Sequence, residues 1–230
     1  MNSIKRISCG AILVVCAISA TLASCGSDNP EPKTEGLDVK RHTQSRATSP
    51  AGDPKDWVYF SFATGAEVPG VTEENRATRT DWDIAFNRFY MRTNSGLSGK
   101  GKGGAVETDK EDFSDVAEAP ADGYVTDVEI TMNGFANGKV TTSKTSGNVA
   151  LNKAVRFSGP PPTYTLNDHV FVVRTADGKY VKVAFESFHK IIPGQKQPAS
   201  GYITFRYAYQ PDGSRNLKSK SMSKSESKSK

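Results

Sequence analysis

The sequence predicts a mainly β domain, and three observations lead to this fold class. No segment of the 230 residues shows three turns of helical amphipathicity. Within residues 169–185, two runs rich in β-branched and aromatic residues flank Asp177-Gly178, the typical pattern of a β-hairpin. Residues 201–209 alternate so that four apolar or aromatic side chains share one face, which predicts a half-buried closing strand.

Earlier segments indicate further strands, although less sharply. Residues 57–62 (WVYFSF) are rich in strand formers and are followed by a glycine turn. Residues 81–92 (DWDIAFNRFYMR) fit a strand or a helix, and their clustered aromatics favour a strand. Residues 123–132 (GYVTDVEITM) alternate only approximately. With 20 Gly and 12 Pro, the chain favours many turns over long helices.

Charge is distributed unevenly along the chain. The formal net charge is +5, of which residues 1–24 carry +2 and residues 213–230 carry +5, so that the remainder carries −2. The predicted domain is therefore slightly acidic. This balance excludes a basic nucleic-acid-binding core, and no nucleic-acid partner is expected.

The N-terminus has the pattern of a bacterial lipoprotein signal. Lys5 and Arg6 precede an apolar stretch over residues 11–20, which is too short to span a bilayer permanently. Residues 22–26 (LASCG) match a lipobox, in which Cys25 is lipidated after cleavage of the signal peptide at residues 1–24. The alternative is an ordinary signal peptide with a chance cysteine. The other two cysteines lie in the signal, so no free thiol is expected in the mature chain.

Composition divides the rest of the chain into three parts. Residues 25–53 are polar and Pro-rich and predict a flexible tether, residues 54–211 the β domain, and residues 212–230 a disordered Ser/Lys tail. Residues 27–31 (SDNPE) resemble the short acidic signals that send some bacterial lipoproteins to the outer face of the outer membrane. We therefore expect a surface-exposed outer-membrane lipoprotein, with a periplasm-facing one as the alternative.

Two motifs suggest chemistry at first sight and do not support it. Residues 96–103 (GLSGKGKG) nearly spell a phosphate-binding loop, but Gly103 stands where a hydroxyl residue is needed and no helix follows. A tightly packed glycine-rich loop is the better interpretation. The histidines, His42, His169 and His189, have no metal-ligand spacing, and no nucleophile motif is present. An enzyme is not expected.

Several short motifs in order resemble the HmuY family of haem-binding lipoproteins. They are residues 57–62, residues 81–85 with residues 96–105, Pro162-Thr163-Tyr164, residues 170–174, residues 176–178 with Lys182-Val183, and residues 202–207. The similarity covers roughly residues 55–209. It implies a sandwich-like all-β fold whose loops hold a haem, anchoring at the outer membrane, and delivery of haem, taken free or from haemoproteins, to a TonB-dependent receptor.

The family clamps haem iron between two histidines or, in some relatives, methionines. The first ligand region corresponds to residues 132–138 (MNGFANG) of this chain, which contain Met132 and no histidine. Met132 is therefore the candidate haem-iron ligand. Residues 157–164 (FSGPPPTY), the second region, contain neither His nor Met, and Tyr164 is a weaker candidate. The alternative is a family member that has lost haem ligation and binds another hydrophobic ligand or a partner protein. If the apolar slot between the β loops were filled by the protein's own side chains, with Met132 turned inward, haem carriage would have to be abandoned.

Overall fold

The computed structural model describes residues 36–47, 53–136, 139–159 and 161–220, except for the side chains of residues 135 and 136. All of these belong to one structural unit. The expected signal peptide, Cys25 and the last ten residues of the expected tail lie outside the described residues. No helix in the described part is long and apolar enough to cross a membrane.

Five strands form the larger sheet, in the order β1-β13-β12-β11-β6, with every neighbouring pair antiparallel. Their bounds are β1 Val39–Thr43, β6 Gly104–Glu107, β11 Phe171–Arg174, β12 Tyr180–Lys190 and β13 Ala199–Gln210. The hairpin predicted around Asp177-Gly178 is confirmed as β11–β12. The predicted closing strand is confirmed as β13.

Four strands form a second antiparallel sheet, in the order β3-β2-β4-β5. Their bounds are β2 Val58–Ser61, β3 Ala66–Glu67, β4 Ile84–Asn87 and β5 Tyr90–Thr93. The main core lies between the two sheets: Phe86 of β4 stacks on Phe205 of β13 at 5.6 Å, and Phe60 of β2 meets the same ring edge-on at 5.4 Å. The predicted all-β, sandwich-like fold is confirmed.

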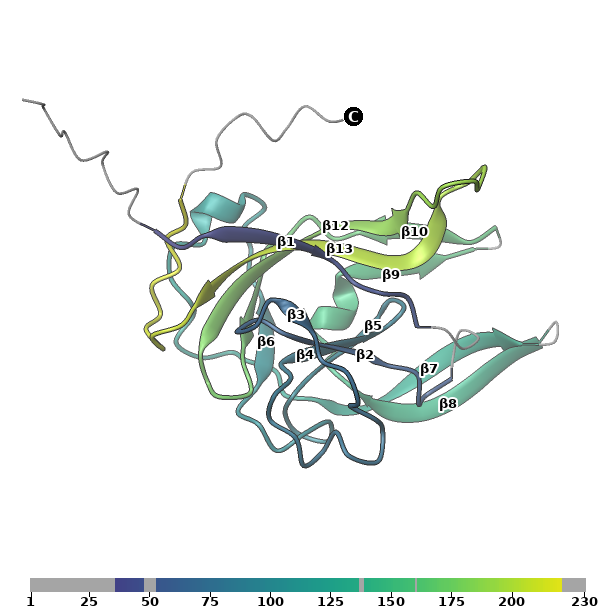
Figure 1. Cartoon of the computed structure of the whole chain (residues 1–230), viewed down its shortest axis with the longest axis horizontal. Helices are drawn as coiled ribbons and strands as arrows, with labels where there is room; N and C mark the ends of the chain where they lie inside the picture. The colour runs from purple at the N-terminus through teal and green to yellow at the C-terminus, as the bar shows by residue number, and fades with distance from the viewer. Residues whose placement is uncertain (1–35, 48–52, 137–138, 160, 221–230) are drawn as a thin grey trace, which may run out of the picture. The chain divides into compact units, whose positions relative to one another are not determined.

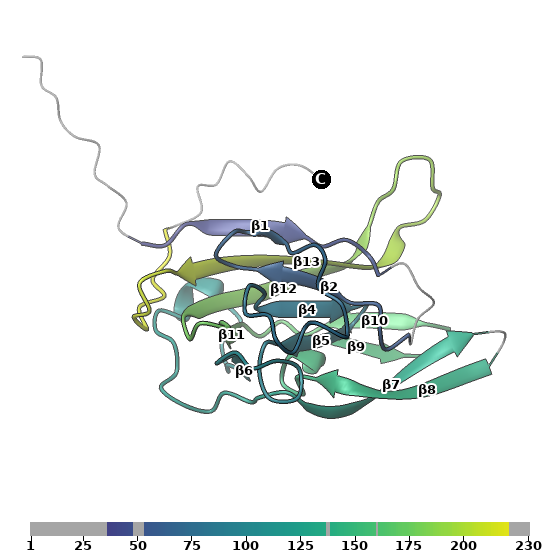
Figure 2. The same ribbon diagram turned by 60° about the horizontal axis from the view of Figure 1, so that its bottom comes forward.

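Two further hairpins extend on the same side of the molecule, the right-hand side in Figure 1, and the view in Figure 2 agrees. One consists of β7 (Val128–Ala136) and β8 (Lys139–Gly147), the other of β9 (Val155–Ser158) and β10 (Thr163–Leu166). The helices of the described part are two single 3₁₀ turns, η1 (Phe113–Asp115) and η2 (Leu151–Lys153). The hairpins matter for function because they carry both regions in which iron ligands were expected.

Residues 81–92 form a tight hairpin, β4–β5, rather than one strand. The reversal takes place at Arg88, which has a positive φ of 56°. A positive φ is uncommon for a residue with a side chain. Turns of this kind usually contain glycine or Asn-Gly, and because Arg88 stands here instead, the sequence contains no turn signal. It places Phe89 at the same end of the molecule as β9 and β10.

The domain extends beyond the expected residues 54–211 at both ends. β1 lies inside the expected tether and pairs with β13, and His42 of β1 packs between Phe60 and Phe205. At the other end, Leu217 is fully buried, although the tail was expected to begin at residue 212. These polar segments are ordered because β13 and a second, smaller core receive their few apolar side chains.

The glycine-rich loop at residues 96–103 wraps around Asn94, which is fully buried. The Asn94 side chain accepts a hydrogen bond from Gly101 N at 3.1 Å, and its backbone carbonyl accepts one from Gly103 N at 3.0 Å. A Cβ at Gly99 would come within 2.0 Å of Asn94 Oδ1. The interpretation as a tightly packed loop is therefore confirmed.

Candidate functional site

Met132, the expected iron ligand, is turned inward. In β7 the residues on either side of it are exposed, and Met132 itself has no exposed surface. Its side chain belongs to a buried cluster with Trp57, Tyr59, Trp82 and Ala85. In this conformation its sulfur atom fills a space in the protein's own core and is not open to a ligand.

Arg92, another buried side chain, holds the β7–β8 hairpin against the second sheet. Its guanidinium lies 3.6 Å from the centre of the Trp57 ring and forms an ion pair with Glu73 at 2.8 Å. From β5 it also donates to Thr145 Oγ1 at 2.9 Å and to Ser146 O at 3.2 Å, both on β8. Exposing Met132 would therefore require this network to be broken.

The second expected ligand region forms part of a cluster of aromatic rings, which we call the aromatic cluster: Phe89, Tyr90, Phe157, Tyr164 and Phe188. Phe157 of β9 stacks on Phe89 with ring centres 5.9 Å apart and planes only 6° apart, and Tyr164 of β10 lies 5.4 Å from Phe157. Phe157 is half exposed, at 50%. The other hairpin joins the cluster through Tyr90, whose hydroxyl oxygen accepts a hydrogen bond from Asn133 N at 2.9 Å.

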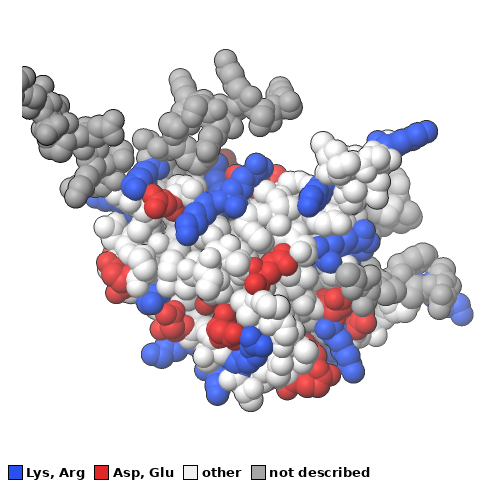
Figure 3. All heavy atoms as spheres, in the orientation of Figure 1, with Lys and Arg blue, Asp and Glu red and all other residues white. Residues whose placement is uncertain are grey.

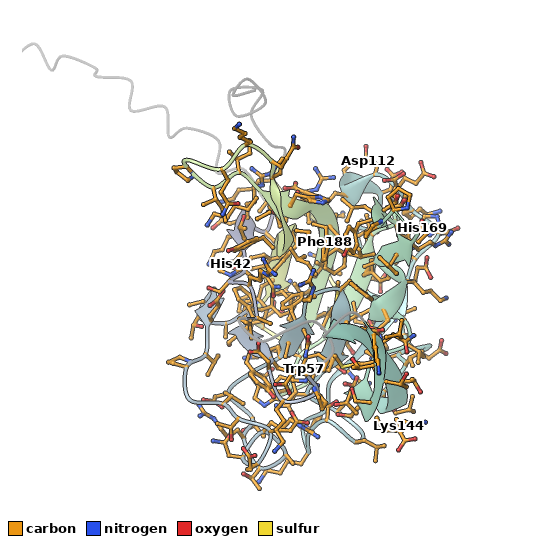
Figure 4. All side chains as sticks on the ribbon, turned by 90° about the vertical axis from the view of Figure 1, so that its right-hand side faces the viewer. His42, Trp57, Asp112, Lys144, His169 and Phe188 are labelled. Atoms are coloured by element: carbon orange, nitrogen blue, oxygen red, sulfur yellow. The ribbon has the colours of Figure 1, made fainter. Side chains whose placement is uncertain are left out.

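A groove of about 460 Å³ opens beside the aromatic cluster, between β10 and β12. Aromatic, aliphatic and polar side chains line it, among them Tyr164, Leu166, Asp168, Glu186, Phe188 and His189. Glu186 is paired with Arg41 at 2.5 Å, which offsets its charge. Figure 4 views the molecule from this end and labels Phe188, with Trp57 of the Met132 cluster below it. The groove is of the size that binds small ligands, about 300–1,000 Å³.

The three histidines differ in what their rings contact. His42 Nε2 lies 3.6 Å from Glu67, and His169 Nδ1 lies 3.0 Å from Glu107. His189 borders the groove and is exposed, and in the described part of the chain no hydrogen bond or ion pair reaches its ring nitrogens. Its ring meets Tyr164 edge-on at 5.9 Å.

Sequence reasoning missed the place of His189, although the chain carries a signal for it. Phe185 and Phe188 both pack in the main core, yet they lie three residues apart in one strand, where alternation would put them on opposite faces. This spacing requires an irregularity, and the register of β12 against β13 indeed shifts around Ser187. Such bulges re-aim side chains and often lie beside functional sites.

Glu107, which pairs with His169, also accepts hydrogen bonds from Asn167 and Lys153. Burial alone would raise the pKa of Glu107, but these three partners outweigh it and lower the pKa to about 2. A lowered pKa in the folded state stabilises the fold above the normal value, and this contribution is lost as the pH falls from about 4.5 towards about 2. We expect Glu107→Gln to flatten the loss of stability over this range, as measured by urea denaturation at several pH values. An unchanged acid profile would contradict this role.

Metal-ligand clusters and surface charge add no second candidate. In residues 36–47, 53–136, 139–159 and 161–220, no group of three His, Cys, Asp or Glu side chains could hold a metal ion. Figure 3 shows several Lys and Arg side chains over β1 and a mixture of Lys, Arg, Asp and Glu over the rest of the face. The aromatic cluster and its groove are thus the candidate site.

Solved structures with this fold come from several bacteria. An HmuY-like heme-binding protein from Bacteroides vulgatus is 23% identical, with a TM-score of 0.56 over 75% of this chain and 92% of that one. The apo HmuY analog of Tannerella forsythia is 23% identical, with a TM-score of 0.58 over 78% of this chain and 100% of that one. A lipoprotein from Bacteroides fragilis is 21% identical, with a TM-score of 0.52 over 75% and 91%. At this identity the likeness concerns the fold.

The sequence comparisons are more specific about family. No curated protein sequence is similar to this chain. The family model described as HmuY protein matches residues 53–207, which is more than half of the chain and includes both hairpins and the groove. The chain therefore belongs to the HmuY family.

Proposed function

We propose that this protein binds haem at the aromatic cluster, as a carrier and not as an enzyme. The observation that carries the proposal is the half-exposed stack of Phe157 on Phe89 beside a groove bordered by the His189 imidazole, which no described residue pairs with. Membership of the HmuY family and the heme-binding description of a similar structure support it. Haem is here the cargo, and the protein's part is to bind, orient and release it.

The residues present fit a porphyrin in two respects. Porphyrin is flat and apolar, and aromatic rings offer it stacking surfaces at little conformational cost. Each Å² of apolar surface removed from water contributes about 25 cal/mol, so that a macrocycle partly covered by Phe157 and Tyr164 gains several kcal/mol before iron is ligated. The imidazole of His189 supplies a nitrogen donor suited to haem iron.

Met132 remains a proposed iron ligand only for a second conformation. Because its sulfur is buried against Trp57 and Trp82, iron reaches it only after the β7–β8 hairpin leaves the second sheet. A thioether exposed in this way would be a sound axial ligand. The Met132→Leu variant, which keeps the packing, separates this role from a purely structural one.

At the level of the cell, we propose that Cys25 carries a lipid that anchors the chain at the outer membrane, exposed at the surface. From there the protein would take haem, free or from haemoproteins, and pass it to a TonB-dependent receptor. The lipobox at residues 22–26 and the lipoprotein among the similar structures support the anchor. Metabolic labelling with a palmitate analogue tests it, with Cys25→Ser as the control that should take up no label.

An absorbance titration with haem tests the carrier function. We expect the chain to shift and sharpen the Soret band of ferric haem and to saturate at one haem per chain, because one aromatic cluster is available in the described part. Reduction with dithionite then tests the ferrous form. Free-haem spectra in both oxidation states would contradict haem binding.

The inward position of Met132 favours a second candidate, a family member that no longer ligates haem. The aromatic cluster would then bind another flat hydrophobic ligand or a partner protein. Protoporphyrin without iron distinguishes the two. If it binds as tightly as haem, iron contributes nothing and the second candidate holds.

A further inference from the structure

We infer that His189, on β12, is the side chain that binds haem iron in this protein. The inference rests on the proposed function and assigns the ligand to a strand outside the two regions in which the family resemblance places ligands. Residue type, accessibility and local backbone structure each support it.

Among the histidine and methionine side chains of the described residues, His189 is the one that is free to bind iron at the groove. The two methionines of the described residues, Met91 and Met132, have no exposed surface. His42 packs against Phe60 and Phe205 and lies near Glu67. His169 pairs with Glu107 through Nδ1 and does not line the groove. His189 remains, an exposed ring whose nitrogens have no partner in the described part.

The ring of His189 lies beside the aromatic cluster. Its ring lies 5.9 Å from the ring of Tyr164, at an interplanar angle of 72°, and 5.6 Å from the ring of Phe188. It lines the same groove as both rings. A porphyrin covering Tyr164 would therefore bring its iron into the neighbourhood of an imidazole, which is a common axial ligand of haem.

The backbone of β12 is irregular next to His189. The register against β13 shifts on both sides of Ser187. The hydroxyl of Ser187 donates to the His189 carbonyl at 2.8 Å and accepts from His189 N at 3.0 Å, which fixes the irregular segment. As a result Phe188 is buried while the next side chain, His189, is exposed at the groove. A backbone held in this way lowers the conformational entropy that is lost when the side chain binds iron.

On binding, His189 would donate a ring-nitrogen lone pair to the haem iron in place of a water molecule. Nothing is oxidised or reduced. Without His189 the porphyrin would keep its aromatic contacts and lose the bond between the ring nitrogen and iron. The substitution should therefore change the haem spectrum more than the binding affinity.

The test compares His189→Ala with His169→Ala and Met132→Leu by titration with ferric haem. All chains carry Cys25→Ser, to remove the expected lipid, and no added histidine tag. We expect His189→Ala to lose the shifted Soret band and to bind at least about tenfold more weakly, with added imidazole restoring the band. The other two variants should match the parent chain. Because His189 is exposed, we expect His189→Ala to fold like the parent chain. Unchanged thermal unfolding would confirm this.

Three results would overturn the inference. A parent-like spectrum of His189→Ala removes His189 as the ligand while leaving haem carriage intact. Loss of the band in Met132→Leu instead assigns the iron to the opened hairpin. A parent chain that leaves the haem spectrum unchanged overturns both the ligand and the proposed function.

Discussion

Met132→Ala is expected to lower the free energy of unfolding by about 2–5 kcal/mol, the range for truncating a fully buried side chain to alanine. The reason is that Met132 packs in a buried cluster with Trp57 and Trp82 and has no exposed surface. Large rigid indoles cannot collapse into the space that the lost thioether leaves. Urea denaturation followed by circular dichroism measures the effect as a lower midpoint with an unchanged slope.

Met132→Leu is the matched control, because it preserves volume and should cost less than about 1.5 kcal/mol. Equal, small effects of both substitutions would contradict a core position for Met132. The pair also matters for interpreting function: a haem defect of Met132→Ala alone would reflect a damaged core, whereas a defect of Met132→Leu would indicate lost ligation.

Arg92→Met should lower the free energy of unfolding by about 1–3 kcal/mol, the range for leaving a buried polar group without its hydrogen-bond partner. Arg92 has no exposed surface. It forms an ion pair with Glu73, donates hydrogen bonds to Thr145 and Ser146, and lies over the Trp57 ring. Replacing it leaves the Ser146 carbonyl without this donor and leaves the Glu73 carboxylate paired with Arg76 alone. The same urea experiment measures the loss, and increased hydrogen exchange in β8 would show that the hairpin is released.

The control for this variant is Lys144→Met, on the same hairpin. Lys144 pairs with Glu129, but both side chains are well exposed, at 65% and 60%, so that water and salt weaken the interaction. Its loss should change stability far less than the loss of Arg92. If both variants unfold at the same urea concentration, the buried network does not hold the hairpin.

Much of the fold could be predicted from the sequence because its strongest signals are local. The Asp177-Gly178 turn and the alternation of residues 201–209 specify β11, β12 and β13, which make up the centre of the larger sheet. The glycine-rich loop was also interpreted correctly, because the hydroxyl residue that a phosphate-binding loop needs is missing from it. Local chemistry was sufficient in these cases.

The remaining features depend on contacts between distant segments, which local patterns do not contain. β1 is polar and becomes a strand only because the edge of β13 pairs with it. The burial of Met132 depends on Trp57 and Trp82, which lie far away in sequence. The aromatic cluster likewise joins Phe89, Phe157 and Phe188 from three separate elements.

Anomalous diffraction at the iron edge, from crystals of the protein grown with haem, tests the central claim most directly. The account predicts one iron peak per chain, next to the His189 ring, with the porphyrin against Tyr164 and Phe157. An iron peak beside Met132, or the absence of any ordered iron at saturating haem, would contradict it.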